Sequence, residues 1–280
     1  RPPGGPGRPA ARVSPARARR LLTRVPPVAF VLELGGHARP IGSYGVCMAA
    51  GIFVVGALAV RAAHRGGLDE GRTIAAIAIA IGFGFTTAWL TFALVELART
   101  GTLDAVRGGG GLVAFGAAPG LARAALVARR ALRIDALRAL ELALPGLAAG
   151  HALGRAGCFL GGCCFGAPFD GAWAVVYRDP RAPAALAGPI GRHPSPLYEA
   201  LGLLALALAF ALVPARRPGS GRRLAAYVAA YCALRVGVEL TRGDAVRGVL
   251  AAGLSTSTLI ALVLCALAAA FLARPSSGNA

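Results

Sequence analysis

Lysine is absent from this sequence, although arginine is frequent enough to give a formal net charge of +18 at pH 7. Charged residues make up only 15% of the 280 residues, and aromatic residues only 6%. A soluble globular domain carries about 25% charged residues, so the low value argues against that class. Because the chain is also rich in alanine, glycine and proline, its arginine-only basic charge indicates a GC-rich coding bias, and we expect no nucleic-acid partner.

The first 27 residues lack the apolar core of a secretory signal peptide, and the single methionine, Met48, comes later in the chain. Arginine, proline, glycine and alanine dominate this segment. A segment of this kind cannot bury enough apolar surface to fold. We predict that residues 1–27 are a disordered basic tail or lie upstream of the mature protein.

Cysteine is infrequent, and its six positions do not form the pattern of a secreted disulfide-rich protein. Three cysteines fall in apolar runs, where a thiol is usually a small buried hydrophobic group: Cys47, Cys232 and Cys265. The other three lie close together in a glycine-rich stretch: Cys158, Cys163 and Cys164.

Hydrophobic residues, by contrast, make up 56% of the sequence and occur in long runs. A membrane-spanning helix needs about 20 mainly apolar residues. The runs predict an all-α integral membrane protein with about seven transmembrane helices, at residues 41–60, 73–97, 112–128, 140–153, 197–213, 224–240 and 249–272.

Residues 154–195 separate the fourth and fifth predicted spans, and we predict that they form a small lobe outside the membrane. The distribution of arginine among the loops, read by the positive-inside rule, favours an extracytoplasmic lobe and a cytoplasmic C-terminus. We therefore expect one seven-span membrane domain at residues 28–273, followed by a short cytoplasmic tail at 274–280.

Residues 151–166 combine one arginine, three cysteines and several glycines beside an apolar run. The guanidinium of Arg155 can hold a phosphate with two donors at once. Glycines such as Gly154 and Gly157 let a backbone or a ligand approach closely. This combination predicts a binding site for a lipid phosphate at the edge of the membrane.

Ionisable residues also occur within the predicted spans. Arg235 and Glu239 are four residues apart and so share a helix face, while Glu141 and Glu199 lie near the starts of two other spans. An ionisable group at bilayer depth costs about 2.5–3.5 kcal/mol, so it needs a partner or a polar cavity. Two interpretations are open, a structural Arg235–Glu239 ion pair or a lumen that admits a charged lipid headgroup, and the nearby Arg155 favours the second.

Residues 193–199 read His-Pro-Ser-Pro-Leu-Tyr-Glu. Pro196 suits the first turn of a helix and Ser195 can cap it, so the motif predicts the start of the fifth span. Capping does not account for the presence of His193, Tyr198 and Glu199 at the same membrane edge.

Four motifs, in this order among the predicted spans, resemble the bacterial prolipoprotein diacylglyceryl transferase family over about residues 41–272. Residues 43–45, Ser-Tyr-Gly, resemble its Trp-Tyr-Gly, and residues 154–166 resemble its signature Gly-Arg-x-Gly-Asn-Phe-x-Asn-Gly-Glu-x-x-Gly. Residues 193–199 are similar to its His-Pro-Ser-Gln-Leu-Tyr-Glu, and residues 234–242, Leu-Arg-Val-Gly-Val-Glu-Leu-Thr-Arg, are similar to its Phe-Arg-x-x-x-Glu-Phe-x-Arg.

The resemblance implies a multi-pass transferase of the bacterial cytoplasmic (inner) membrane. Such an enzyme moves the diacylglyceryl group of phosphatidylglycerol to the thiol of the lipobox cysteine in a prolipoprotein signal peptide. A thioether forms and glycerol 1-phosphate leaves. The expected partners are phosphatidylglycerol, prolipoproteins and membrane lipid, and neither a cofactor nor a metal is implied.

The resemblance also implies roles for single residues. Arg155 and Arg235 match the family's two key arginines, which would stabilise the developing phosphate charge. Glu239 would orient Arg235. His151 completes the expected catalytic set for a different reason: it lies four residues before Arg155 and could replace the family's absent basic histidine, with a packing role as the alternative. Substrate-binding roles are expected for Tyr44, Glu141, Gly154, Gly157, Cys158, His193, Ser195, Tyr198, Glu199, Tyr231 and Arg242; Glu141 falls where the family has an Asp.

Two departures from the family pattern bear on the chemistry. The family usually has a histidine in Ser-Phe-His-Gly-Gly, whereas this chain reads Ala114-Phe115-Gly116-Ala117. Cys158, Gly161 and Cys163 stand where the signature has Asn, Asn and Glu. Two alternatives to a transferase therefore stay open: a membrane thiol or metal redox protein that uses the cysteine cluster, and a non-catalytic lipid-binding paralogue.

Overall fold

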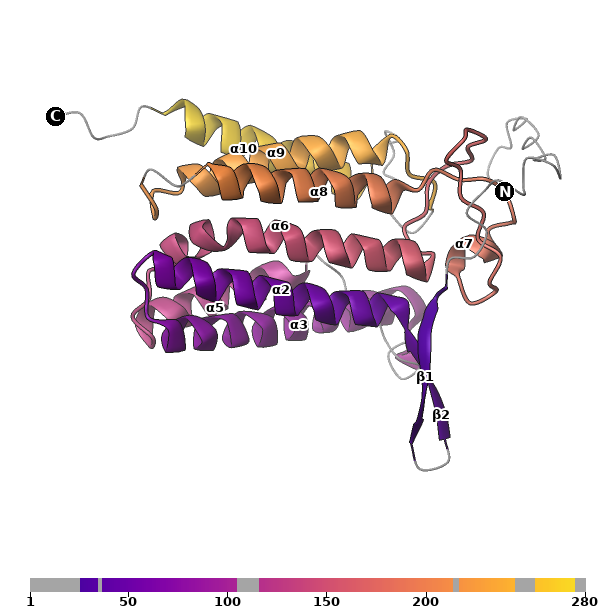
Figure 1. The fold of residues 1–280 in the computed structure, drawn as a ribbon, viewed down its shortest axis with the longest axis horizontal. Coiled ribbons are helices and arrows are strands. Elements are labelled where there is room, and N and C mark those ends of the chain that lie inside the picture. Colours follow the sequence, from indigo (N-terminus) through magenta and orange to yellow (C-terminus); the bar gives the residue numbers. More distant parts are fainter. Residues whose placement is uncertain (1–25, 35–36, 105–115, 214–216, 245–254, 275–280) are drawn as a thin grey trace. The chain divides into compact units, whose positions relative to one another are not determined.

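The computed structural model describes residues 26–34, 37–104, 116–213, 217–244 and 255–274, most of which are helical (Figure 1). The helices are α2 (Ser43–Arg65), α3 (Glu70–Thr100), α5 (Ala117–Arg130), α6 (Ala136–Gly161), α7 (Pro183–Leu186), α8 (Ser195–Leu212), α9 (Arg222–Glu239) and α10 (Thr256–Ala273). Within the described ranges, three segments are long and apolar enough to cross a membrane: Ser43–Arg65, Glu70–Ala98 and Ser195–Leu212.

A two-stranded antiparallel hairpin precedes these helices, so the all-α prediction is wrong for this segment (Figure 1). Strand β1 (Val28–Leu34) pairs with β2 (His37–Gly42). The valines, phenylalanine and leucines of β1 favour a strand, and the run is too short to be a membrane span. Ser43 ties the hairpin to α2, because its backbone N–H donates to the Pro27 carbonyl at 2.9 Å.

Each predicted span overlaps one helix of the described chain. Residues 112–115 of the third span and 249–254 of the seventh lie outside the described residues, as do residues 1–25 of the predicted basic tail and 275–280 of the predicted C-terminal tail. The fourth span differs most from its helix, because α6 continues to Gly161 instead of ending near residue 153. The helix ends where Gly162 adopts a left-handed conformation with φ of 69°, a common helix stop.

The chain divides into two compact units, which we call unit 1 and unit 2. Unit 1 consists of Arg1–Val54, Leu147–Leu212 and Ala225–Ala280, and unit 2 of Val55–Gly146 and Val213–Leu224. The boundary therefore falls within α2, α6 and α9.

In unit 2, the main packing is between α3 and α5. A β-carbon at Gly120 would lie 2.3 Å from the Phe83 carbonyl oxygen, so only glycine permits this approach of the two helices. Arg123 of α5 lies over the Phe83 ring, with its guanidinium carbon 5.9 Å from the ring centroid.

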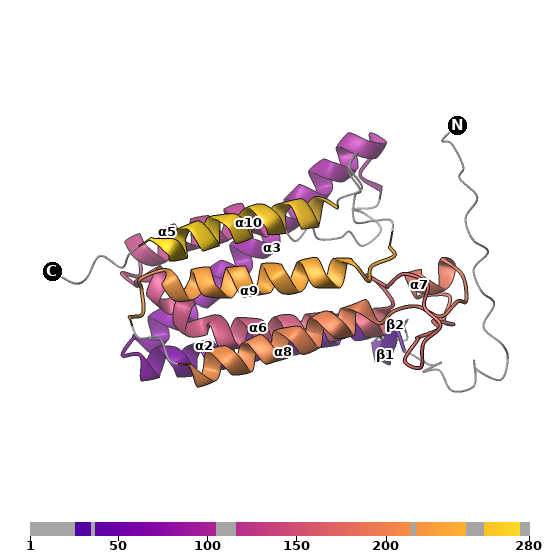
Figure 2. The same cartoon turned by 90° about the horizontal axis from the view of Figure 1, so that it is seen from above.

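In unit 1, α6, α8 and α9 lie side by side (Figure 2). Ala152, Ala200 and Leu203 are buried between them, with Tyr231 and Leu234 packed against these residues. Ala152 and Ala200 are small and let α6 and α8 approach closely. Arg155 and Glu199, which lie near them on the same helices, can therefore form an ion pair.

The segment between α6 and α8 packs on the end of α6 through the buried residues Phe159, Val175, Tyr177, Ala182 and Ala184. The backbone N–H of His193 donates to the Ala167 carbonyl at 3.0 Å and joins the two ends of the segment, while the N–H of Ala167 donates to the Thr241 carbonyl at 2.8 Å and joins the segment to the residues after α9.

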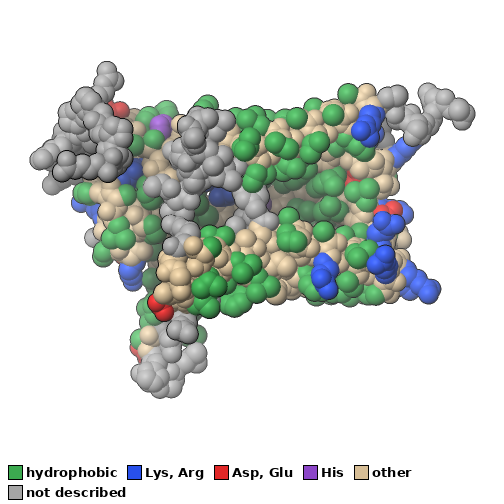
Figure 3. Space-filling model, turned by 180° about the vertical axis from the view of Figure 1, so that it is seen from behind, with side chains coloured by type: hydrophobic (Ala, Val, Ile, Leu, Met, Phe, Trp, Pro, Cys, Tyr) green, Lys and Arg blue, Asp and Glu red, His purple; other side chains and the backbone are tan. Residues whose placement is uncertain are grey.

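Hydrophobic side chains cover the flanks of the helices on the face drawn in Figure 3, and arginines gather near helix ends. On α8, Leu201, Leu208 and Leu212 are all more than 60% exposed. Seven and four residues separate these leucines, so they share one helix face. A continuous exposed apolar face of this kind is typical of a surface that contacts lipid.

Candidate active site

Arg155 is held from one side by residues of α8 and α9. Its guanidinium lies 3.0 Å from the Glu199 carboxylate, and the Tyr231 hydroxyl donates to the same carboxylate oxygen at 3.1 Å. Glu199 is buried, with 1% of its surface exposed. The Nε of Arg155 is also buried and has no acceptor among the described residues. The site therefore fixes the arginine and leaves a donor available for an anionic ligand.

Arg235 forms the second cation of this group. It pairs with Glu239 on the same helix at 2.7 Å, so the ion pair that the four-residue spacing allowed as one of two interpretations is present. Both side chains are about 10% exposed or less. Because Tyr231 precedes Arg235 by four residues, the two share the face of α9 that meets α6 and α8.

His151 lies near both cations. Its ring centroid is 5.3 Å from that of Tyr231, and both Arg155 and Arg235 are close enough to interact with it electrostatically. The predicted catalytic residues Arg155, Arg235, Glu239 and His151 are thus brought together within unit 1.

Tyr44, Gly154 and Gly157 meet where the first turns of α2 cross α6. A β-carbon at Gly157 would lie 2.8 Å from the Cys47 β-carbon, so this position requires glycine. One at Gly154 would lie 3.8 Å from the Met48 methyl group. Both glycines therefore lie against α2, and Gly157 is the one that the approach requires. This approach brings the Tyr44 hydroxyl near Arg155, with which it interacts electrostatically.

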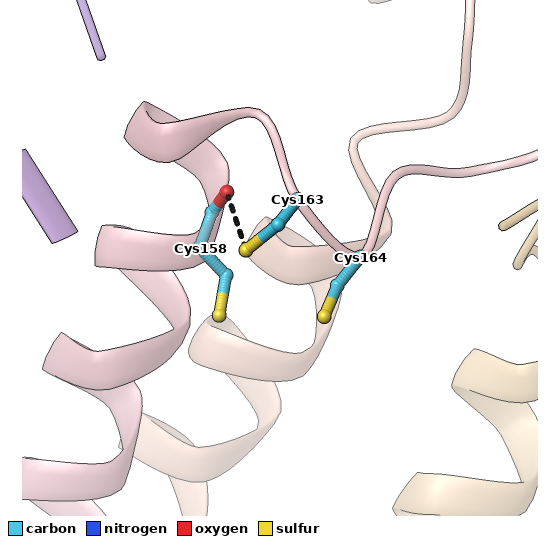
Figure 4. Close-up of side chains that lie close together, drawn as sticks. All are labelled: Cys158, Cys163 and Cys164. Atoms are coloured by element: carbon cyan, nitrogen blue, oxygen red, sulfur yellow. Dashed lines mark hydrogen bonds between the residues drawn. The ribbon is translucent and has the colours of Figure 1, made fainter. Parts of the chain in front are cut away.

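The three cysteines that replace or neighbour the family's polar signature residues also meet. Cys158 lies on α6, and Cys163 and Cys164 lie in the turn that follows it. Their sulfur atoms all lie within 4.8 Å of one another (Figure 4). The Cys163 thiol donates to the Cys158 carbonyl oxygen at 3.7 Å.

His193 and Tyr198 belong to an aromatic group at the start of α8. Nδ1 of His193 lies 3.2 Å from the Tyr198 hydroxyl, and its ring stacks on Phe169 with centroids 4.0 Å apart. Trp173 donates to the same hydroxyl at 2.7 Å. Burial lowers the pKa of His193 below its ordinary value of 6.5.

Ser195 is the first residue of α8, as predicted. Its hydroxyl donates to the Thr241 carbonyl at 2.9 Å and lies 2.7 Å from the Thr241 hydroxyl, a partner that the capping prediction did not include. These bonds join the start of α8 to the residues that follow α9.

Arg242 follows Thr241 and donates two hydrogen bonds to Asp244, from Nε at 2.8 Å and from Nη2 at 2.5 Å. Burial opposes its charge, but the hydrogen bonds and the charge of Asp244 raise the pKa of Arg242 above its ordinary value. Arg242 also interacts electrostatically with Cys164 and Arg155. It therefore belongs to the same group of polar residues.

Glu141 does not belong to this group. It lies in unit 2, fully buried, and its carboxylate accepts three backbone N–H bonds, from Gly219 at 2.6 Å, Arg223 at 3.0 Å and Leu224 at 3.2 Å. The free N–H groups at the start of a helix attract a carboxylate, and here Glu141 caps α9. These bonds account for its burial without a ligand, so we do not include it in the proposed substrate site.

Three residues of the site were not found by sequence reasoning: Asp244, Thr241 and Tyr177. Asp244 could have been noted as an acidic residue two positions after Arg242, which is a weak signal. Tyr177 gave no local signal, because it reaches the cysteines only through the folding of the segment between α6 and α8.

A family model described as prolipoprotein diacylglyceryl transferase matches residues 29–274. A phosphatidylglycerol–prolipoprotein diacylglyceryl transferase of Dehalococcoides mccartyi is 32% identical over 260 residues, which cover 86% of this chain and 94% of the relative. Proteins of the same name are 30% identical over 225 residues in Clostridium tetani, covering 79% and 88%, and 31% identical over 249 residues in Streptomyces griseus, covering 86% and 74%.

Proposed function

The chain belongs to the prolipoprotein diacylglyceryl transferase family, and from that premise we propose that it transfers the diacylglyceryl group of phosphatidylglycerol to the lipobox cysteine of prolipoproteins. The names of its relatives support the two substrates. The observation that carries the proposal is the buried group formed by Arg155, Glu199 and Tyr231, in which the Arg155 Nε has no acceptor among the described residues.

In this proposal, Arg155 and Arg235 bind the phosphate of phosphatidylglycerol. The thiol sulfur of the acceptor attacks the glyceryl carbon next to the phosphate ester. A carbon–sulfur bond forms, the carbon–oxygen bond breaks, and glycerol 1-phosphate leaves with the electron pair. Negative charge grows on the leaving phosphate, so cations that are already fixed in place lower the barrier without rearranging.

The two carboxylates of the site serve to position these cations. Glu199 holds Arg155, and Glu239 holds Arg235. Tyr44, with its hydroxyl near Arg155, is proposed to bind the headgroup. Gly154 and Gly157 lie against α2, which brings Tyr44 to the site. The edge at which substrate enters is formed by four further residues: His193, Ser195, Tyr198 and Arg242. His151 remains the candidate base.

We further propose that the described helices belong to a multi-pass protein of the bacterial cytoplasmic membrane, with one membrane domain at residues 28–273. The three long apolar helices and the exposed leucine face of α8 support membrane insertion. The proposal includes seven spans and a lobe that begins beyond the end of α6. Arginine is more frequent in the loops on the side of the C-terminus, so this side is proposed to be cytoplasmic and the lobe extracytoplasmic.

The test is transfer from labelled phosphatidylglycerol to a lipobox peptide by the purified full chain. Arg155→Ala should lower kcat/KM by about 100-fold or more, the usual effect of removing one donor to a developing oxyanion. Arg181→Ala is the matched control, because Arg181 is exposed and paired with the nearby Asp179, and it should keep wild-type activity.

Complementation of a bacterium depleted of its own transferase provides the second readout. If the wild-type chain is inserted, binds phosphatidylglycerol and yet neither complements nor transfers, the protein is a non-catalytic lipid-binding paralogue and the proposal is wrong.

A further inference from the structure

The cysteine cluster has the spacing of a metal site. In a tetrahedral zinc site with Zn–S bonds of about 2.3 Å, sulfur atoms lie about 3.8 Å apart. The sulfurs of Cys158, Cys163 and Cys164 lie within 4.8 Å of one another (Figure 4). Closing by about 1 Å would therefore allow all three to bind one ion.

The backbone of the turn is shaped to hold the sulfurs together. Gly162 ends α6 with φ of 69°, and Cys164 has φ of 54°. A left-handed conformation is unfavourable for a residue other than glycine, and such residues gather at functional sites, where surrounding contacts hold them. These two left-handed residues, on either side of Cys163, direct the chain back, so that Cys163 and Cys164 face Cys158 (Figure 4).

Two cations lie beside the cluster. Arg155 and Arg242 are both close enough to Cys164 to interact with it electrostatically. A zinc ion with three thiolate ligands carries a net charge of −1, and these guanidiniums, each also paired with a carboxylate, would attract it.

Tyr177 supplies an independent observation. It is 3% exposed, and its hydroxyl has no hydrogen-bond partner among the described residues. The hydroxyl interacts electrostatically with Cys163 and Cys158. A buried hydroxyl requires an acceptor, and a metal-bound thiolate is one. Groups that donate to metal ligands in this way commonly strengthen the site.

We propose that Cys158, Cys163 and Cys164 bind a zinc ion whose fourth coordination position receives the acceptor thiol of the transfer reaction. This inference rests on the proposed function. Catalytic zinc sites have three protein ligands and one open position, and a thiol that coordinates the ion is deprotonated outright. The site would thus supply the thiolate that the attack requires.

The proposed step is balanced without an oxidant or reductant. The lipobox thiol binds zinc and releases its proton to solvent. Its sulfur then attacks the glyceryl carbon, the carbon–sulfur bond forms as the carbon–oxygen bond breaks, and the electron pair leaves with glycerol 1-phosphate. The thioether sulfur is a weaker ligand than a thiolate, so the product dissociates from the ion.

Metal content tests the ligands. The full chain, purified in detergent without chelator, should contain zinc in stoichiometric amount by elemental mass spectrometry. Cys163→Ser should lose this zinc, whereas Cys265→Ser, a matched change in α10 outside the cluster, should retain it. Tyr177→Phe keeps all three ligands and should bind zinc about 10- to 100-fold more weakly. Copper in place of zinc, a disulfide within the cluster, or equal zinc in Cys163→Ser and wild type would overturn the assignment.

The open position is tested on the wild-type chain, so that misfolding of a variant does not decide the result. After exchange with Co²⁺, sulfur-to-metal charge-transfer absorption should appear, and a lipobox peptide should change it. The same peptide with serine in place of cysteine should leave the spectrum unchanged. If the cysteine peptide has no effect, the acceptor thiol does not bind the ion and the inference fails.

The transfer assay separates this inference from the proposed function. If the zinc-free chain transfers lipid at the rate of the loaded chain, the role of zinc is wrong and the transferase stands. If the loaded chain shows the cobalt spectrum but transfers nothing, the proposed function is wrong and the metal site stands.

Discussion

Replacement of Glu199 by glutamine is the change that tests most directly how Arg155 is positioned. Glu199 is buried, and one of its carboxylate oxygens accepts from both Arg155 at 3.0 Å and Tyr231 at 3.1 Å. Glutamine preserves the shape of the side chain and one acceptor oxygen. It removes the negative charge that compensates the guanidinium.

The size of the effect follows from these contacts. A hydrogen bond to a charged group contributes about 1.5–3 kcal/mol. If it holds Arg155 on the departing phosphate, its loss raises the activation barrier by the same amount. Because 1.36 kcal/mol is tenfold in rate, kcat/KM should fall about 10- to 150-fold. Tyr231→Phe removes a second hydrogen bond to the same carboxylate but leaves its ion pair with Arg155, so kcat/KM should fall less than in Glu199→Gln.

The assay is kcat/KM for transfer from labelled phosphatidylglycerol to a lipobox peptide, with thermal unfolding in the same detergent to show that each variant is folded. The double variant should lose less than the product of the two single effects, because Tyr231 and Arg155 share one carboxylate. If Glu199→Gln stays within about twofold of wild type while Arg155→Ala is inactive, Glu199 does not position the arginine and our account of the site is refuted.

Three further changes test other contacts. Glu141→Gln should lower the free energy of unfolding by about 2–3 kcal/mol, since it replaces a buried carboxylate that accepts three N–H bonds; unchanged thermal unfolding would show that the cap of α9 is dispensable. Burial lowers the pKa of His193, so the unfolded chain binds more protons at acid pH. The contribution of His193 to the free energy of unfolding is therefore fully present above pH 6.5 and is lost as the pH falls below it. His193→Gln should remove this pH dependence from unfolding midpoints measured between about pH 7.5 and 5.5. Gly157→Ala places a β-carbon 2.8 Å from that of Cys47 and should cost about 1–3 kcal/mol; Cys47→Gly should restore part of this loss in the same unfolding measurement, and a stable Gly157→Ala single variant would mean that α2 does not approach α6 as described.

Most helices were predictable, because the length of an apolar run is a local property of the sequence. The runs at 197–213 and 224–240 correspond closely to α8 and α9. The end of α6 was not predictable in this way. Its glycines, cysteines and Arg155 read as a loop by composition, but they continue the helix because α2 and α8 pack against them.

The hairpin at residues 28–42 was missed for a different reason. Strand β1 is apolar enough to be read as part of the hydrophobic region that leads into α2, and the pairing of β1 with β2 is a contact between segments that composition does not reveal. The backbone bond from Ser43 to Pro27 that fixes its position is likewise visible only in the fold.

For the site, ionisable residues in apolar runs were a strong signal, because burying a charge is costly unless it finds a partner. This reasoning identified Arg235, Glu199 and Glu239, and the structure pairs Arg235 with Glu239 on α9. The same reasoning identified Glu141 as notable but could not assign its partner. A buried carboxylate can either cap a helix N-terminus or bind a ligand, and the sequence does not distinguish these roles. The three N–H bonds to Glu141 in the structure show that it caps α9.

The departures from the family motifs leave the residues that bind the leaving phosphate unchanged and affect the residues available to activate the acceptor thiol. The arginines and the carboxylates that hold them are present and paired, so the part of the site that binds the leaving phosphate is intact. By contrast, the replacements Cys158 and Cys163, together with Cys164, form a group of three sulfurs, and two of these cysteines, Cys158 and Cys164, interact electrostatically with Arg155. Stabilising a leaving group needs cations, whereas activating a thiol needs a base or a metal. A chain that keeps the first set and changes the second is therefore better explained by a new means of activating the same acceptor than by loss of the reaction.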